Sequence, residues 1–212
     1  MTAITVITAQ NTVGVSAVQT IDAEMIIAQV RAVAQDIGVD AVKIGMLGTA
    51  ESIDAVAQAI GELALDVPVV IDPVMVSESG AELLSPDARG ALARRLLPRA
   101  TVVTPNLPEA RVLAGAGGDC DDAQALARTI HALGPDVVIV TGGHRAQVSD
   151  LFYDGAQVLA IDGPRHPDGA AHGSGCTHSS VLAARLAHGD SPVQAARIAR
   201  AMAAQAVGHG LR

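Results

Sequence analysis

Residues 67–72 read Val-Pro-Val-Val-Ile-Asp, a short apolar run that ends in a carboxylate and is followed directly by Pro73. A run of β-branched residues without polar alternation is typical of a strand buried on both faces of a sheet. Four further runs, nearly all apolar, occur along the chain, and stretches with helical spacing separate them. These four predicted strands are Ala3–Thr8, Ala41–Gly45, Thr101–Thr104 and Val137–Thr141.

The stretches between these strands predict amphipathic helices. Ser85 is a candidate N-cap, because Pro86 follows it at the position where proline suits the first turn of a helix. Asp22 and Ser52 are similar N-cap candidates. The alternation of strands and helices predicts an α/β fold with a mostly parallel central sheet flanked by helices. The predicted helices are Ala23–Ile37, Ile53–Leu65, Pro86–Leu96, Asp121–Leu133, Thr177–Ala187 and Pro192–Val207.

One pair of strands has a different connection. Val148–Tyr153 and Gln157–Ile161 are joined by Asp154-Gly155, a dipeptide that is typical of a tight turn between antiparallel strands. We therefore expect an antiparallel hairpin at one edge of the sheet. The chain has 212 residues, no linker and no internal repeat, so a single domain over residues 1–212 is predicted.

Composition argues against several classes of protein. The chain has one Phe, one Tyr, no Trp and a net charge of −8, so stacking on bases or a basic surface for nucleic acid is not expected. No apolar run reaches the roughly 18 residues of a membrane span, and no basic segment of a signal peptide opens the chain. Cys120 and Cys176 do not form a disulfide framework. A cytoplasmic protein is therefore expected.

Polar residues follow the predicted strands at the end where open α/β sheets bind ligands. Asp72 follows the third strand, and Asn106 and Glu109 follow the fourth. Carboxylate oxygens are the ligands that Mg²⁺ prefers, so Asp72 and Glu109 are candidate metal residues. The other strand-end groups are Gln10 and Asn11, Gly45 and Met46, and Thr141, Gly142, Gly143 and His144.

The sequence His172-Gly173-Ser174-Gly175-Cys176-Thr177 comes directly before a predicted helix. Glycines allow the backbone to approach a ligand closely, and the free N–H groups of a helix start attract an anion. The same positive end favours a thiolate, so Cys176 is a candidate base. With two nearby acids this arrangement indicates phosphoryl transfer from a nucleotide. Neither a P-loop nor a dinucleotide-binding glycine motif is present.

Each candidate also has a purely structural interpretation. The glycine turn could be an ordinary helix start with a packed cysteine, and Asp72 could only begin a turn at Pro73. Asn106 and Glu109 could cap a helix that begins near Leu107. The remaining candidates could be loop polar groups (Gln10, Asn11), core side chains (Met46, Met75), surface histidines (His144, His172) or a structural thiol (Cys120).

Six motifs occur together in an order that is typical of one enzyme family. They are Ala9-Gln10-Asn11-Thr12, Lys43-Ile44-Gly45-Met46-Leu47, Asp72-Pro73-Val74-Met75, Thr104-Pro105-Asn106-Leu107-Pro108-Glu109-Ala110, Gly142-Gly143-His144 and His172-Gly173-Ser174-Gly175-Cys176-Thr177. Together they resemble hydroxymethylpyrimidine/phosphomethylpyrimidine kinase of thiamine biosynthesis, a member of the ribokinase-like superfamily. Most ribokinase-like kinases have aspartate where Cys176 stands, whereas this family has cysteine.

This resemblance implies a three-layer ribokinase-like fold and two successive reactions. ATP would phosphorylate the hydroxymethyl group of 4-amino-5-hydroxymethyl-2-methylpyrimidine, and a second ATP would convert the monophosphate into the diphosphate. Family members are commonly homodimers. The resemblance implies that Cys176 is a base or substrate-orienting group, and that the N–H groups of Gly173, Ser174, Gly175 and Cys176 form an anion cradle. It implies pyrimidine contacts for Gln10 and Met46. It also implies contacts with Mg²⁺ and the triphosphate for Asp72, Asn106 and Glu109, and positions near the nucleotide for Thr141 and Gly143.

The chain departs from the family pattern at three places. The opening strand and its Gly-rich loop are not found ahead of the first predicted strand, so the domain is expected to be N-terminally truncated relative to the family. Many members have lysine where Thr141 stands, and the C-terminal tail is short. Three other functions remain open: a pyridoxal-type kinase, a non-catalytic binding module, and a cysteine hydrolase that would need His172 and an orienting residue beside Cys176.

Overall fold

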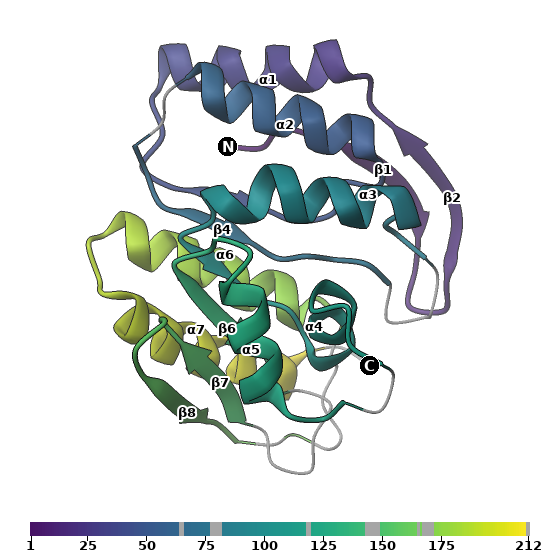
Figure 1. The fold of residues 1–212 in the computed structure, drawn as a ribbon. Helices are drawn as coiled ribbons and strands as arrows, with labels where there is room; N and C mark the ends of the chain where they lie inside the picture. The colour runs from purple at the N-terminus through teal and green to yellow at the C-terminus, as the bar shows by residue number, and fades with distance from the viewer. Residues whose placement is uncertain are drawn as a thin grey trace.

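A mixed six-stranded sheet runs through the molecule in the order β3-β4-β5-β6-β7-β8 (Figure 1). The computed structural model describes residues 1–63, 66–76, 82–117, 120–142, 149–164, 166 and 172–210. The strands β3 to β6 are parallel, and β7 and β8 follow as an antiparallel edge hairpin, as predicted. Their bounds are β3 Val42–Ile44, β4 Val69–Ile71, β5 Val102–Val103, β6 Val137–Val140, β7 Ser149–Tyr153 and β8 Val158–Asp162.

Helices cover both faces of this sheet, which gives three layers. Along β4, Val69 and Ile71 pack into one hydrophobic cluster and Val70 into the other, because successive side chains of a strand point to opposite faces. The first cluster joins the sheet to α1 (Ala23–Asp36), α2 (Ala50–Glu62), α3 (Pro86–Ala91), α4 (Leu107–Leu113) and α5 (Ala123–His131). The second joins it to α6 (Ser174–Ala187) and α7 (Pro192–His209).

The first predicted strand is placed differently from the prediction. Residues 3–8 were expected to form a buried strand of the main sheet, but β1 (Val6–Gln10) pairs only with β2 (Val15–Thr20) in a separate antiparallel ribbon. Ile4 and Ile7 are 46% and 51% exposed. The following residues, Val-Ser-Ala-Val-Gln-Thr, supply an adjacent partner, so the backbone groups of the apolar run are satisfied locally. The sequence prediction missed β2.

The helix starts agree with the sequence at two of three predicted caps. Asp22 caps α1 by accepting the N–H of Met25 at 2.8 Å, and Ser85 holds the N-cap position of α3 with Pro86 next. The prediction for Ser52 was wrong, because Thr49 caps α2 and its Oγ1 accepts the N–H of Ser52. Ser52 is instead a buried residue of the first turn. A further short element, of π-helical and then 3-10 geometry, extends α3 from Leu92 to Arg99.

Strand β3 forms one edge of the sheet. Among the described residues only β4 pairs with it, and on its other side lies a cavity of about 600 Å³. The floor of this cavity includes Lys43, Gly45 and Met46, and its walls come from α1, α2, α6 and the first residues of the chain. The cavity therefore adjoins the carboxyl end of β3, where the sequence predicted substrate contacts.

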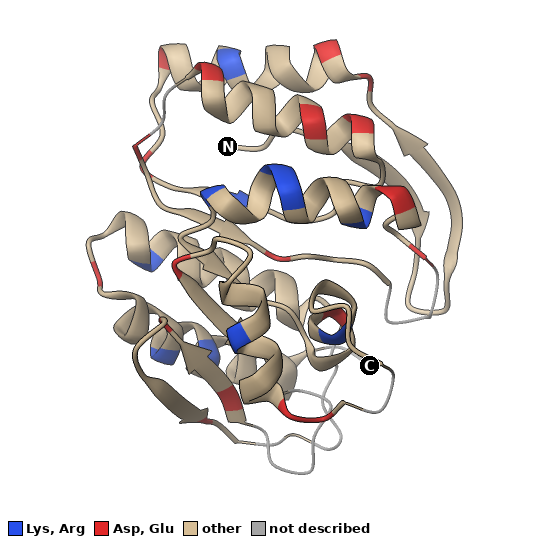
Figure 2. Ribbon diagram, in the orientation of Figure 1, with Lys and Arg blue, Asp and Glu red and all other residues tan. Residues whose placement is uncertain are grey.

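Charged residues are spread over many elements. Helix α2 carries Asp and Glu but no Lys or Arg, α6 and α7 carry Arg but no Asp or Glu, and the strands of the sheet carry few charges (Figure 2). In the part of the chain that the structure describes, no helix is both long and apolar enough to cross a membrane.

Candidate functional site

The glycine turn before α6 forms an open helix start. Gly173 has a φ of +79°, a left-handed conformation that glycine adopts without strain, and α6 begins at the next residue. The first helical hydrogen bond runs from the N–H of Thr177 to the carbonyl of Gly173. The N–H groups of Ser174, Gly175 and Cys176 therefore precede the helical ladder and are available to an anion.

The described residues leave space around this turn. Among them, a Cβ atom built on Gly173 would meet no heavy atom within 4 Å, and one on Gly175 would meet only the Oδ2 of Asp72, at 4.0 Å. Cys176 is exposed, so its sulfur is accessible. The structure thus brings the predicted anion cradle, the candidate base and a carboxylate of the neighbouring strand end to one place.

Asp72 follows β4 and is almost fully buried. Its N–H donates to the carbonyl of Ile44 at 2.9 Å, which continues the pairing of β4 with β3. Its Oδ2 accepts a hydrogen bond from the Oγ of Ser179 at 3.0 Å and lies 3.4 Å from the Nζ of Lys43. Asp72 therefore contacts side chains of both β3 and α6 and does more than begin a turn at Pro73.

Asn106 and Glu109 form the capping box of α4. The Asn106 side chain accepts the N–H of Glu109 at 2.9 Å, and the Oε2 of Glu109 accepts the N–H of Asn106 at 2.9 Å. The Oε1 of Glu109 also accepts the N–H of Met75 at 3.4 Å, which ties α4 to the segment after β4. The structural interpretation of both residues is thus correct, and it is compatible with a role in binding.

Burial dominates the electrostatics of Glu109. Loss of water raises the pKa of this carboxyl from 4.5 to about 7, although the N–H of Asn106 lowers it. The negative charge of Asp72 adds to the rise, which shows that the two carboxyls interact. Two buried acids that repel each other are a suitable donor set for a divalent cation. Among the described residues no group of three His, Cys, Asp or Glu side chains could hold a metal, so water or phosphate oxygens would complete the coordination.

The segments after β5 and β6 lie side by side. Asn106 and Thr141 form an isolated parallel bridge, and the N–H of Thr141 donates to the carbonyl of Pro105 at 2.9 Å. The two candidate nucleotide residues are therefore neighbours. Gly143 and His144 lie outside the described residues.

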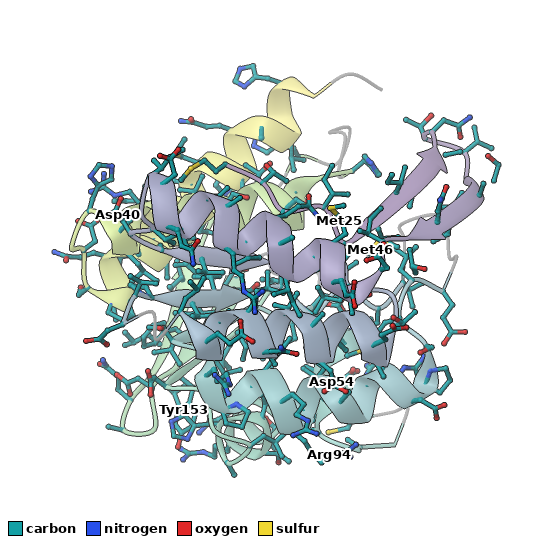
Figure 3. All side chains as sticks on the ribbon, turned by 90° about the horizontal axis from the view of Figure 1, so that it is seen from above. Met25, Asp40, Met46, Asp54, Arg94 and Tyr153 are labelled. Carbon is teal, nitrogen blue, oxygen red and sulfur yellow. The ribbon has the colours of Figure 1, made fainter. Side chains whose placement is uncertain are left out.

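The two candidate pyrimidine contacts, Met46 and Gln10, lie on different parts of the structure, because Gln10 belongs to the β1–β2 ribbon and not to the main sheet. Met46 lines the cavity beside β3. Its carbonyl accepts a hydrogen bond from the hydroxyl of Thr5 at 2.7 Å, near the base of the β1–β2 ribbon (Figure 3). Gln10 is exposed in the β1–β2 ribbon, where the Oγ1 of Thr8 donates to it. Among the described residues no hydrogen bond joins Gln10 to the ends of the sheet strands.

Sequence reasoning gave no role to two residues that contact Asp72. Lys43 is the only lysine of the chain and stands in an apolar strand, which is a signal that it has a nearby partner. Ser179 is fully buried on α6, one helical turn after Gly175. A serine at that position on an Ala-rich helix gave no comparable signal.

A buried ionic cluster behind the site was also missed. Asp150 on β7 lies 3.3 Å from the Nε2 of His178 on α6 and 3.9 Å from the Nε of Arg200 on α7. Its Oδ1 accepts the N–H of Gly142 at 2.9 Å, so the cluster holds the end of β6 beside α6. A Cβ on Gly142 would lie 2.1 Å from the carbonyl oxygen of Ser149, which explains the glycine.

The chain is similar to phosphomethylpyrimidine kinases over its whole length. The family model described as phosphomethylpyrimidine kinase matches residues 1–212. A hydroxymethylpyrimidine/phosphomethylpyrimidine kinase of Mycobacterium tuberculosis is 42% identical over 191 residues, which are 88% of this chain and 70% of that protein.

Solved structures of two related kinases share the fold. The phosphomethylpyrimidine kinase of Clostridium difficile superposes with a TM-score of 0.83 at 34% identity, over 98% of this chain and 86% of that one. A pyridoxal kinase of Bacillus subtilis, solved as an ADP complex, superposes with a TM-score of 0.84 at 40% identity, over 94% of this chain and 77% of that one. The expected three-layer ribokinase-like fold is therefore confirmed.

Proposed function

Because this chain belongs to the phosphomethylpyrimidine kinase family, it is a phosphotransferase, and we propose that it acts in thiamine biosynthesis through the turn before α6. Its substrates would be 4-amino-5-hydroxymethyl-2-methylpyrimidine and then the monophosphate of that compound, with ATP as the donor in both steps. The observation that carries this proposal is the meeting of Gly173, Gly175 and Cys176 with Asp72 at one open helix start.

In the first step the hydroxymethyl oxygen attacks the γ-phosphorus of ATP. A phosphorus–oxygen bond to the substrate forms, the bond to the β-phosphate oxygen breaks, and ADP leaves. The proton of the hydroxyl passes to the sulfur of Cys176, which is exposed at the first turn of α6. In the second step an unprotonated phosphate oxygen of the monophosphate attacks the γ-phosphorus of a second ATP, the bond to the β-phosphate oxygen breaks, and ADP leaves without proton transfer to Cys176.

Charge develops on the transferred phosphoryl group during both steps. The N–H groups of Ser174, Gly175 and Cys176 point out of the start of α6 and would stabilise this charge without rearrangement. The left-handed Gly173 sets the direction in which these donors point. This fixed arrangement of backbone dipoles supports catalysis by positioning and electrostatics, as phosphoryl transfer requires.

Asp72 and Glu109 fit the requirements for Mg²⁺, because both are buried acids and their charges interact. Asp72 and Glu109 would hold Mg²⁺, which when bound would supply positive charge to neutralise the phosphate groups of the nucleotide. The two carboxyls would hold it partly through water, since both oxygens of Glu109 already accept backbone N–H groups. Asn106, Thr141 and Gly143 would contact the nucleotide, and Thr141 would do so without the positive charge of a lysine.

Met46 and Gln10 would contact the pyrimidine. Met46 already lines the cavity beside β3, at the carboxyl end of the sheet. Gln10 lies on the β1–β2 ribbon, so its contact would require the ribbon to close over the ring when the substrate binds. A homodimer in the cytoplasm is the expected setting of this activity.

Pyridoxal is the second candidate substrate. It also carries a hydroxymethyl group on a flat heteroaromatic ring, and the pyridoxal kinase of B. subtilis is 40% identical to this chain, close to the 42% of the mycobacterial pyrimidine kinase. Overall identity therefore does not separate the two substrates, and the preference for the pyrimidine depends on the family match over residues 1–212.

Substrate competition tests this choice. ADP release is measured with each compound alone, and kcat/KM is then determined with both present. We expect the pyrimidine to be turned over with the higher kcat/KM. Equal or better turnover of pyridoxal would reject the pyrimidine as the preferred substrate, and absence of ADP release with either compound would reject kinase activity of this chain.

A further inference from the structure

Lys43 is an unusual residue for its place in the fold. It is the only lysine of the chain and lies in β3 between Val42 and Ile44, with its side chain 22% exposed. An ammonium group at a largely buried position requires an opposite charge, because loss of water disfavours the ion. The Nζ of Lys43 lies 3.4 Å from the Oδ2 of Asp72.

Gly45 opens the path between these two groups. Lys43 lies in β3, and Gly45 is the first residue after this strand. A Cβ on Gly45 would lie 2.7 Å from the Nζ of Lys43, too close for any side chain to be placed there without a shift. The side chain of Lys43 therefore crosses over Gly45 to reach the end of the neighbouring strand, where Asp72 stands.

Ser179 lies on α6, in a helical layer outside the sheet, and contacts the same carboxylate of Asp72. Its side chain is fully buried, and its Oγ donates to the Oδ2 of Asp72 at 3.0 Å. The Oγ also lies 2.9 Å from the carbonyl of Gly175, in the first turn of α6. Asp72 is thus linked on one side to the edge strand β3 and on the other to the helix that starts at the anion turn.

Both contacts go to one oxygen of the carboxylate. A half-turn of the Asp72 carboxylate exchanges two equivalent oxygens and restores both contacts, but any smaller rotation would break them, so the pair fixes the plane of the carboxylate. A group that takes part in phosphoryl transfer must be held within about 0.5 Å of its productive position. Two partners from two different elements supply that restraint.

Building on the proposed function, we propose that Lys43 and Ser179 are positioning residues that hold Asp72 for binding of the Mg²⁺–nucleotide complex. Neither residue needs to touch the substrate. Lys43 supplies the counter-charge for the buried acid, and Ser179 couples its orientation to the start of α6. Rotation of α6 relative to β4 would break the Ser179 contact and misplace the carboxylate.

Ser179→Ala tests the orientation directly, and Thr129→Ala is its matched control. Both hydroxyls donate to the carbonyl four residues earlier in their helix, but Ser179 is buried against Asp72 and Thr129 is exposed on α5. Binding of a non-hydrolysable ATP analogue is measured by calorimetry, and the rate of ADP release is measured at saturating ATP and pyrimidine, each while the Mg²⁺ concentration is varied. Each variant is assayed at a temperature well below its own unfolding midpoint.

We expect Ser179→Ala to raise the Mg²⁺ concentration for half-maximal nucleotide binding and for half-maximal rate by at least threefold, because a carboxylate that has lost one of its two restraints binds the cation less well. Thr129→Ala should leave this concentration unchanged. Loss of folded protein lowers the maximal rate but does not shift this concentration, so a merely structural role of Ser179 would not produce the effect. A shift of less than threefold would reject the inference.

Lys43→Met gives a second test at saturating Mg²⁺. We expect kcat to fall at least tenfold, while the KM for the pyrimidine changes less than threefold, because Lys43 acts through Asp72 and not on the substrate. A smaller fall in kcat would also reject the inference. If Lys43→Met does not fold, the result for Ser179→Ala decides alone. Lack of activity in the wild-type chain would instead reject the proposed function.

Discussion

Replacing Glu109 by Gln removes an ionisable group whose folded environment disfavours its charge. Burial raises the pKa of Glu109 from 4.5 to about 7. Because the pKa is raised in the folded state, the stabilising contribution of the neutral carboxyl is fully present below pH 4.5. That contribution is lost as the pH rises through about 7. Gln keeps one acceptor oxygen, for the N–H of Asn106, so the capping box of α4 is retained. The acceptor for the N–H of Met75 is lost, and this cost does not vary with pH.

The magnitude follows from the size of the pKa difference. A rise from 4.5 to about 7 corresponds to about 3 kcal/mol at roughly 1.4 kcal/mol per pKa unit. We therefore expect the free energy of unfolding of the wild type, relative to Glu109→Gln, to fall by about 3 kcal/mol between pH 4.5 and pH 8. Most of this change should occur between pH 4.5 and about 7, where Glu109 is ionised in the unfolded state and still protonated in the folded state.

Urea unfolding followed by circular dichroism measures this difference. A chelator keeps the protein free of divalent cations, which would stabilise the ionised carboxyl and hide the effect. The titrating groups that do not interact with Glu109 are common to the two proteins and cancel in the difference, which then reports Glu109 together with its interaction with Asp72. Glu24→Gln is the matched control, because it removes an exposed carboxyl from the first turn of α1. A wild-type minus Glu109→Gln difference that stays flat, or rises with pH, would refute the reasoning.

Three other substitutions and reactions test separate parts of the site. In steady-state kinetics Cys176→Ala should lower kcat at least a hundredfold, which is the usual scale for loss of a general base, and should change the KM for ATP little. Near-normal turnover of this variant would show that Cys176 is not the base. Cys176 is exposed and Cys120 is half-buried, so iodoacetamide should label Cys176 first, as read by peptide mass spectrometry; equal rates would argue against an accessible, activated thiol. Asp150→Ala should destabilise the protein by about 3–5 kcal/mol in urea unfolding, because Arg200 and the N–H of Gly142 lose a buried partner; a loss below about 1 kcal/mol would contradict the role of this cluster.

Much of the main sheet could be predicted from the sequence. The run at residues 67–72 and its counterparts are apolar on both faces, and this composition fits a covered parallel strand better than any other element. The Asp154-Gly155 turn likewise identified the β7–β8 hairpin. The apolar run at residues 3–8 looks the same, but its partner is the adjacent β2, and composition alone does not reveal pairing.

The site was predictable where backbone chemistry determines it and less so where packing does. Glycines before an Ala-rich helix indicated the turn at Gly173, because few other roles require that pattern. The contact of Ser179 with Asp72 spans 107 positions of the chain and depends on how α6 lies against β4. The cluster around Asp150 depends in the same way on three elements that meet only in the folded protein.

The identity of the phosphorylated products tests the central claim most directly. Phosphorus NMR of the wild-type chain with ATP, Mg²⁺ and 4-amino-5-hydroxymethyl-2-methylpyrimidine follows each phosphate ester as it forms. We predict that the pyrimidine monophosphate appears first and the diphosphate second, with one ADP released at each step. ADP without any pyrimidine phosphate, or no ADP at all, would contradict a pyrimidine kinase site at the start of α6.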